Sequence, residues 1–398
     1  MWKHFKETYL VKFWSPFFSI LLLALLSTYF FGITGKHWAV TGEFTRWGGG
    51  ILELFGVNVE NWKYFDVIGF RGHWWQRIDG VMLVAMFIGA LIATLFASRF
   101  NLTMPTSKTR IIQAFVGGII AGFGARLGMG CNLASFFTGI PQFSLHAWFF
   151  TFMSILGVYV GTKIIQMPFL QSKAKLIKGA YISKPKEKKD TFLWGAMLLA
   201  VSLVVIVWLM QSDSFGEKKS VLGIASLFGL AFGFVIAKGQ VCFTSAFRDL
   251  FLLGRGMVAK AIVLGMFIST LGVFAFIVLG VHPKITWVGP NVVIGGFLFG
   301  LGITLAGGCE CGWLYRAMRG QVQYIIVGVG NLVGSTLLAY TWKWYDKALA
   351  TSFPKINLLE SFGNYGGLLV NYVLLMVLLL VILLIEKQVQ NKIKEGVF

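Results

Sequence analysis

Long apolar runs, each about as long as a membrane-spanning helix, recur along the whole chain. The runs are continuous rather than alternating, which favours helices over the strands of a barrel. Hydrocarbon leaves backbone groups no water to bind, so a span must satisfy them within itself. The pattern predicts spans at 13–33, 78–97, 111–130, 147–167, 191–210, 221–237, 258–280, 291–308, 324–342 and 365–386. We therefore expect an all-α polytopic membrane protein with about ten transmembrane helices.

Four shorter apolar stretches lie between these runs. They are too short to cross a bilayer as helices, and we expect them to be re-entrant or interfacial helices. They cover residues 38–56, 132–145, 240–252 and 311–319.

A glycine-rich run occurs twice. "GGIIAGFGARLGMGCN" at 117–132 and "GGFLFGLGITLAGGCE" at 295–310 match without a gap and both place a polar residue after Gly-Cys. Upstream, "MLVAMFIGAL" at 82–91 resembles "IVLGMFISTL" at 262–271. An odd number of predicted crossings separates the copies, so the second copy is expected to be inverted. Inverted repeats are a transporter architecture with the pathway at their interface. The alternative is similarity by composition, because small residues every four positions pack helices closely.

The repeat gives a division of the chain into four parts. A first transmembrane repeat is followed by a lysine-rich linker with a connecting span, a second inverted repeat, and a C-terminal loop and span. These parts cover residues 1–168, 169–212, 213–345 and 346–398.

Charge sets the expected orientation. Only 13% of the residues are charged, against about 25% in an average soluble domain. The net charge of +19 comes from lysines and arginines in short loops, which is typical of topology signals and argues against nucleic acid as a partner. The linker lysines are Lys173, Lys175, Lys178, Lys184, Lys186, Lys188 and Lys189. They predict that the linker and both termini are cytoplasmic, with an uncleaved first span.

The cysteines are the first candidates for chemistry. Cys131 and Cys309 occupy equivalent places in the two repeats, and Cys242 lies in a short segment where the first repeat has Ala39. Thiols are soft and polarizable, so thiols at one constriction would suit a sulfur- or selenium-containing anion. The alternative is that they are inert packing residues. Cys309 and Cys311 lack the further ligands of a metal site and are strained as a disulfide, so we expect free thiols, no metal and no cofactor.

Polar residues at membrane depth are the second set of candidates. A charge at the bilayer centre costs about 2.5–3.5 kcal/mol and usually faces a cavity or a partner. Candidates in or beside the apolar runs are Arg126, Asn132, Glu310, Arg248 and Asp249, with Arg46 and Lys36 at the outer loop to draw in anions. Arg126 either attracts an anion or pairs with Glu43, Asp79 or Glu310. The chain has no nucleotide-binding or zinc-protease motif, so we expect no ATP hydrolysis and no enzyme activity.

"GMGCN", "CFTSAFRD" and "AGGCECGW" resemble the signatures of the YeeE/YedE sulfur-transport family, and the resemblance covers nearly the whole chain. It implies a helical fold of two pseudo-symmetric halves, in which three cysteines line a constriction and pass thiosulfate by S–H···S contacts. Two of these cysteines fall on Cys131 and Cys309. The third lies in the first repeat of the thiosulfate permeases, where this chain has Ala39. Here Cys242 of the second repeat supplies it.

The residues and the resemblance together predict a transporter of the bacterial inner membrane for a small sulfur or selenium species. The selenium role and a small cytoplasmic sulfur-carrier protein as partner are implied by the resemblance alone. The alternative is a membrane-embedded thiol enzyme or carrier that holds persulfide or selenide on Cys309 or Cys311. A membrane subunit that scaffolds a cytoplasmic partner is a third possibility, which leaves the doubled cysteine motif unexplained.

Overall fold

Ten long helices dominate the computed structural model, which describes residues 4, 6–70, 72–105, 107–168, 170–171, 190–212, 216 and 219–395. Within these residues each helix is long and apolar enough to cross a membrane, as the sequence predicts. They are α2 (Pro16–Thr34), α5 (Ile78–Phe96), α6 (Lys108–Leu127), α7 (Leu145–Ile165), α8 (Phe192–Gln211), α9 (Lys219–Gly239), α11 (Met257–Val278), α12 (Pro290–Ala306), α14 (Val322–Thr341) and α16 (Asn364–Lys394).

Short helices occupy the four shorter apolar stretches. Two lie in the first half, where α3 (Thr41–Leu54) is helical and 132–145 holds only the π-helical turn η3 (Asn132–Phe137) and the 3₁₀ turn η4 (Ile140–Gln142). Two lie in the second half, α10 (Phe243–Leu253) and α13 (Glu310–Met318). The remaining short elements are η1 (Lys6–Val11), α4 (Lys63–Ile68), η2 (Trp74–Gln76), η6 (Trp342–Trp344), η7 (Lys347–Thr351) and α15 (Leu358–Phe362).

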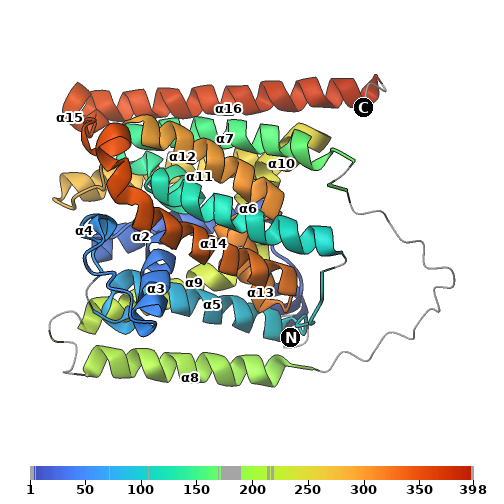
Figure 1. Ribbon diagram of the computed structural model, residues 1–398. Coiled ribbons are helices and arrows are strands. Elements are labelled where there is room, and N and C mark those ends of the chain that lie inside the picture. Colours follow the sequence, from blue (N-terminus) through green and yellow to red (C-terminus); the bar gives the residue numbers. More distant parts are fainter. Residues whose placement is uncertain are drawn as a thin grey trace.

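The long helices run roughly side by side as one bundle (Figure 1). In that view α16 lies along one outer edge and α8 along the opposite edge. Both helices are mostly unburied, as expected for helices that face lipid. The two chain ends lie at the same end of the bundle, which we call the terminal face, and α3 and α4 lie at the other end, the cap face (Figure 1). The lysines of the predicted cytoplasmic linker, 173–189, lie outside the described residues.

Helices α6 and α12 cross at the centre of the bundle through their glycines. The carbonyl oxygen of Gly124 lies 2.8 Å from where a Cβ on Gly295 would be, and that of Gly117 lies 2.8 Å from where one on Gly302 would be. The start of each helix therefore faces the end of the other, and the two helices pack antiparallel. No side chain larger than hydrogen fits at these positions.

Each of these central helices packs on a further helix by a second glycine pair. On α6, Gly118 and Gly122 lie against α14 at Asn331. On α12, Gly296 and Gly300 lie against α7 at Phe150 and Ser154. In the rest of the bundle, α5 packs on α9 and α11 packs on α2. The core is thus built from closely packed pairs of long helices.

Candidate functional site

The glycine-rich helices end where the predicted cysteines begin short helices. Gly307 ends α12 with a positive φ of 82°, a conformation that favours glycine. Cys309 then stands at the N-cap of α13, and Cys131 stands at the same place before η3. Cys242 is the N-cap of α10. Each of the three thiols is only 1% exposed, so the chain turns and places its cysteines in the interior of the bundle.

The predicted thiols of the second half lie together. The sulfur atoms of Cys242 and Cys309 are 3.7 Å apart. The backbone N–H of Phe243 donates to the Cys309 sulfur at 3.3 Å, and the Cys311 thiol lies beside Cys309. A Cβ on Gly312 would lie 2.6 Å from the Cys242 sulfur, so this glycine gives the thiols room. All four cysteines are free thiols, as expected.

Glu310 joins the first half to this group. Its Oε2 accepts a hydrogen bond from the Thr41 hydroxyl at 2.8 Å, and its Oε1 accepts one from the Asn331 amide at 3.3 Å. The Cys131 thiol lies against the same carboxyl group. Glu310 is 3% exposed and, within the described residues, contacts neutral donors and no cation in an ion pair. We call Cys131, Cys242, Cys309, Cys311 and Glu310 the thiol cluster.

Asn132 follows Cys131 as Glu310 follows Cys309, and it is also buried, with 4% exposure. Searched over the described residues, the structure holds no group of three His, Cys, Asp or Glu side chains placed to bind a metal ion.

A polar cavity of about 400 Å³ opens at the cap face beside the thiol cluster. Its wall includes Thr41, which also binds Glu310, together with Ala39 and Ala134. The cavity therefore reaches the cluster on the side of Cys131. We call it the basic vestibule, because most of its titratable side chains are basic: Lys36, His37, Arg46, Arg126, His282, Lys284 and Lys355, with Asp79 as the acidic exception.

Arg126 fits the cavity-facing interpretation of the sequence. Its side chain is 5% exposed, its Nε has no hydrogen-bond partner, and its guanidinium lies 5.1 Å from the centre of the Tyr64 ring. Two of the acidic partners proposed for it bind other arginines instead. Glu43 pairs with Arg46 and Arg77, and Asp79 pairs with Arg46. Arg126 thus lines the vestibule without an ion pair to either of these carboxylates.

Lys284 and His37 were missed by sequence reasoning. The Lys284 ammonium lies 3.4 Å from Nε2 of His37 and 3.4 Å from the Met129 carbonyl oxygen. Desolvation by the surrounding protein, and then the charge of Arg126, lowers the pKa of Lys284 to about 8. Burial and the Lys284 charge hold the pKa of His37 well below its ordinary value. A lone loop lysine in "VHPKITWVGP" gives only a topology signal, so the sequence alone does not place it in the wall of the vestibule.

The remaining predicted residues lie apart from the thiols. Arg248 and Asp249 pair with each other on α10 at 2.9 Å, each about one-third exposed. Arg46 lines the vestibule, and its guanidinium also donates to the carbonyl oxygens of Ile68 and Gly69, which fixes the segment before α5. Arg46 therefore has a structural role as well as a place at the entrance.

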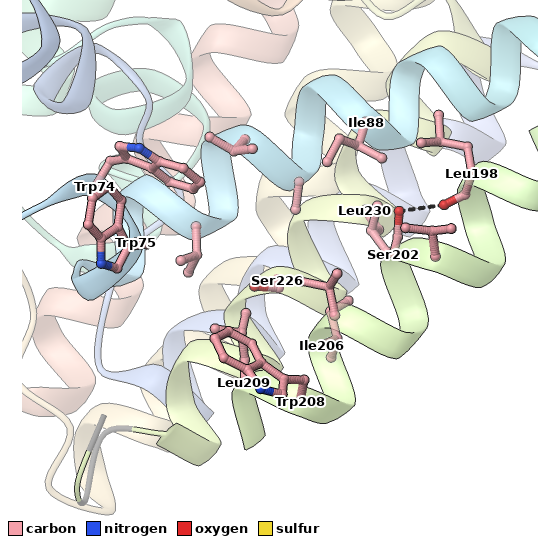
Figure 2. A pocket seen from close by; sticks show the side chains of 15 residues that line it. Trp74, Trp75, Ile88, Leu198, Ser202, Ile206, Trp208, Leu209, Ser226 and Leu230 are labelled. Carbon is pink, nitrogen blue, oxygen red and sulfur yellow. Dashed lines mark hydrogen bonds between the residues drawn. The ribbon is translucent and has the colours of Figure 1, made fainter. Parts of the chain in front are cut away.

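A second cavity, of about 500 Å³, lies among α5, α8 and α9 and is almost wholly apolar (Figure 2). Its two hydroxyl groups are used within their own helices. Ser202 donates to the Leu198 carbonyl oxygen and Ser226 to that of Leu222. With no titratable group in its wall, this groove offers no contact specific for an anion.

The chain is similar to known transport proteins. The Sulphur transport family matches residues 2–160 and 238–396. Probable transporter YedE of Salmonella typhimurium is 52% identical over 391 residues, which cover 97% of this chain and 96% of that protein. Thiosulfate transporter TsuA of Escherichia coli is 36% identical over 118 residues, 29% of this chain and 30% of that protein. TsuA of Spirochaeta thermophila is 41% identical over 79 residues, 20% of this chain and 24% of its own.

These relatives are named as transporters, which supports a transporter and not an enzyme. The resemblance seen in the cysteine motifs is therefore confirmed. The family matches more than half of the residues, and ten apolar helices within the described part of the chain are long enough to span a membrane. This multi-pass membrane protein belongs to the Sulphur transport family.

Proposed function

We propose that this protein carries a small sulfur- or selenium-containing anion, such as thiosulfate, from the basic vestibule through the thiol cluster. The observation that carries the proposal is the shared residue Thr41, which lines the vestibule and donates to Glu310 inside the cluster. A cavity rich in cations collects anions, and here it adjoins buried thiols. The relatives named as thiosulfate transporters supply the substrate class.

The thiol cluster suits passage better than storage of an anion. Its donors are neutral, so they replace water around the anion without the strong attraction of a bound cation. The cationic residues Arg126 and Lys284 lie on the vestibule side instead. An anion is therefore concentrated first and then handed to weaker, softer contacts, which favours release.

The two halves are proposed to be inverted repeats that meet at this site. The doubled motif aligns Gly117 with Gly295 and Gly124 with Gly302. The antiparallel α6–α12 contact exchanges these partners, because Gly117 faces Gly302 while Gly124 faces Gly295. Such a reciprocal contact is expected of a two-fold axis in the membrane plane. Cys131 and Cys309 then approach the pathway from opposite directions, and the short helices re-enter the membrane.

Cys242 is the one thiol of the three that has no cysteine counterpart in the other half of the chain. Ala39, its counterpart, lines the vestibule, whereas Cys242 touches Cys309 and is not part of the vestibule wall. We infer the order Cys131, then Cys309 and Cys242, for an anion that enters from the cap face. This asymmetry would place two polarizable thiols, Cys309 and Cys242, at the end of the pathway that is nearer the terminal face.

We further propose a bacterial inner membrane with both termini in the cytoplasm. The termini share one face (Figure 1), and lysines in the linker favour the cytoplasmic side. A small cytoplasmic sulfur-carrier protein would receive the cargo there.

Uptake into proteoliposomes tests the proposal. Thiosulfate, selenite and selenide are compared for the wild-type protein and for Cys131→Ala and Cys309→Ala. Loss of one soft contact of about 1 kcal/mol should slow uptake roughly fivefold. Cys242→Ala should be partly rescued by Ala39→Cys, which returns a thiol to the pathway. Unchanged uptake in both single variants contradicts the thiol pathway, and a stable sulfur or selenium adduct in mass spectrometry favours a thiol enzyme or carrier instead.

A further inference from the structure

Four cationic side chains gather at the terminal face, on the opposite side of the thiol cluster from the vestibule. They are Arg99, Lys238, Arg316 and Arg319. Arg99, Lys238 and Arg319 line one small pocket together with Tyr315 and Phe13. Within the described residues none of the four forms an ion pair with a carboxylate. Basic residues at a membrane edge are common, but here three of the four line one pocket and two of them contact one aromatic ring.

Two of the arginines share one aromatic ring. The Arg99 guanidinium lies 3.7 Å from the centre of the Phe13 ring, and that of Arg319 lies 5.5 Å from the same centre. Nη1 of Arg99 is buried and has no hydrogen-bond partner. Burial, and then the charge of Arg319, lowers the pKa of Arg99. Two like charges are thus held close together with a donor left over, an arrangement that an anion between them would stabilise.

Lys238 completes the pocket. It is 2% exposed, and its ammonium donates to the carbonyl oxygens of Leu10 and Lys12. The backbone N–H of Trp14 in turn donates to the Lys238 carbonyl oxygen. The segment that carries Phe13 is therefore fastened over the pocket through neutral groups, and no carboxylate among them neutralises the lysine.

The pocket is connected to the thiols through α13. Tyr315 lines the pocket, and its hydroxyl accepts a hydrogen bond from Nε of Arg316 at 3.0 Å. Nη1 of Arg316 donates to the Tyr324 hydroxyl at 2.9 Å and to the Gly307 carbonyl oxygen at 3.1 Å. The charge of Arg316 also acts on Cys242. Hydrogen bonding thus joins Arg316 to Tyr315 at the pocket, and Arg316 lies close enough to Cys242 for its charge to act on that thiol.

We propose that this pocket is an exit site for the transported anion, formed by Arg99, Lys238 and Arg319 and covered by Phe13. The proposal rests on the function proposed above and adds a second anion site after the thiol cluster. The ligand is a small divalent or monovalent sulfur or selenium anion; the headgroup of an anionic lipid shares this chemistry. The free space of about 20 Å³ holds about one water-sized group, so an anion fits once the Phe13 side chain, which is 41% exposed, moves aside.

Transport kinetics in proteoliposomes test the exit site. In Arg99→Gln/Arg319→Gln we expect the maximal rate of thiosulfate uptake to fall about tenfold. The KM at the cap face should stay unchanged, because the vestibule is intact. Lys387→Gln/Lys392→Gln removes the same charge from exposed positions of α16 and should behave as wild type. Arg99→Lys/Arg319→Lys, which keeps the charge, should restore much of the rate. Equal rates in the arginine double variant and the α16 control would overturn the proposal.

Two further measurements are needed. One separates a lipid headgroup from the transported anion as the ligand of the pocket, and the other separates failure of the exit site from failure of the proposed function. A rate defect that occurs only in liposomes containing phosphatidylglycerol, and not in pure phosphatidylcholine, would assign the pocket to a lipid headgroup and overturn the substrate site. If the wild-type protein transports no thiosulfate, the proposed function fails on its own. Titration of thiosulfate into the solubilised full chain then decides the site: loss of one binding event in Arg99→Gln/Arg319→Gln supports it, and an unchanged count rejects it.

Discussion

Lys284 should make anion uptake depend on pH. With its pKa lowered to about 8, the ammonium is charged below that value and neutral above it, so its attraction for an anion is present at low pH and lost as the pH rises. An anion about 4 Å away gains about 1 kcal/mol in water and about 4 kcal/mol at an effective dielectric constant near 20. Because Arg126 and Arg46 remain charged in the same vestibule, we expect the lower part of this range, about 1.4 kcal/mol or tenfold in KM.

The assay is initial thiosulfate uptake by proteoliposomes, with KM measured on both sides of pH 8. The wild-type KM should rise about tenfold across this window. Lys284→Gln should show the high KM throughout, and Lys284→Arg should keep the low KM above pH 8, because arginine stays charged. Lys387→Gln, at the terminal end of α16, is the matched control. A KM for Lys284→Gln that still rises across the window would refute the assignment of the titration to Lys284.

Three further predictions concern the cluster, the entrance and the helix packing. Thr41→Val leaves the Glu310 carboxyl group short of a donor and should lower the stability by about 1–3 kcal/mol, measured as unfolding in detergent, whereas Thr41→Ser should not. Arg126→Gln should raise the KM for thiosulfate without loss of folded protein; an unchanged KM would remove Arg126 from the entrance. Gly118→Ala places a Cβ 2.5 Å from the Val327 carbonyl oxygen and should cost about 1–3 kcal/mol, while Gly50→Ala, which has nothing within 4 Å, should be neutral in the same unfolding assay.

The spans were predictable because each is a local property of the chain. A run of about 20 apolar residues can bury itself in lipid only as a helix, and tertiary contacts do little to change that. The short helices were also signalled by apolar stretches of reduced length. The prediction of a short helix at 132–145 was less accurate. The chain forms two separate turns there, η3 and η4, because Pro141 interrupts a continuous helix.

The site was only partly predictable because its contacts are long-range. The doubled motif pointed to Cys131 and Cys309, and the short apolar stretch 240–252 pointed to Cys242. Nothing local placed Thr41 against Glu310, since 269 residues separate them. Lys284 likewise reaches the vestibule only because its loop folds over the cap face.

The central claim is that the cysteine thiols of the protein contact a sulfur atom of the substrate during transport. The ratio of thiosulfate uptake to sulfate uptake tests this claim most directly. The two anions share charge and shape and differ in one sulfur atom, so the vestibule should attract both alike. We predict that wild-type proteoliposomes take up thiosulfate in strong preference to sulfate, and that the preference collapses in Cys131→Ser/Cys309→Ser. A preference that survives in the double variant would contradict the thiol pathway.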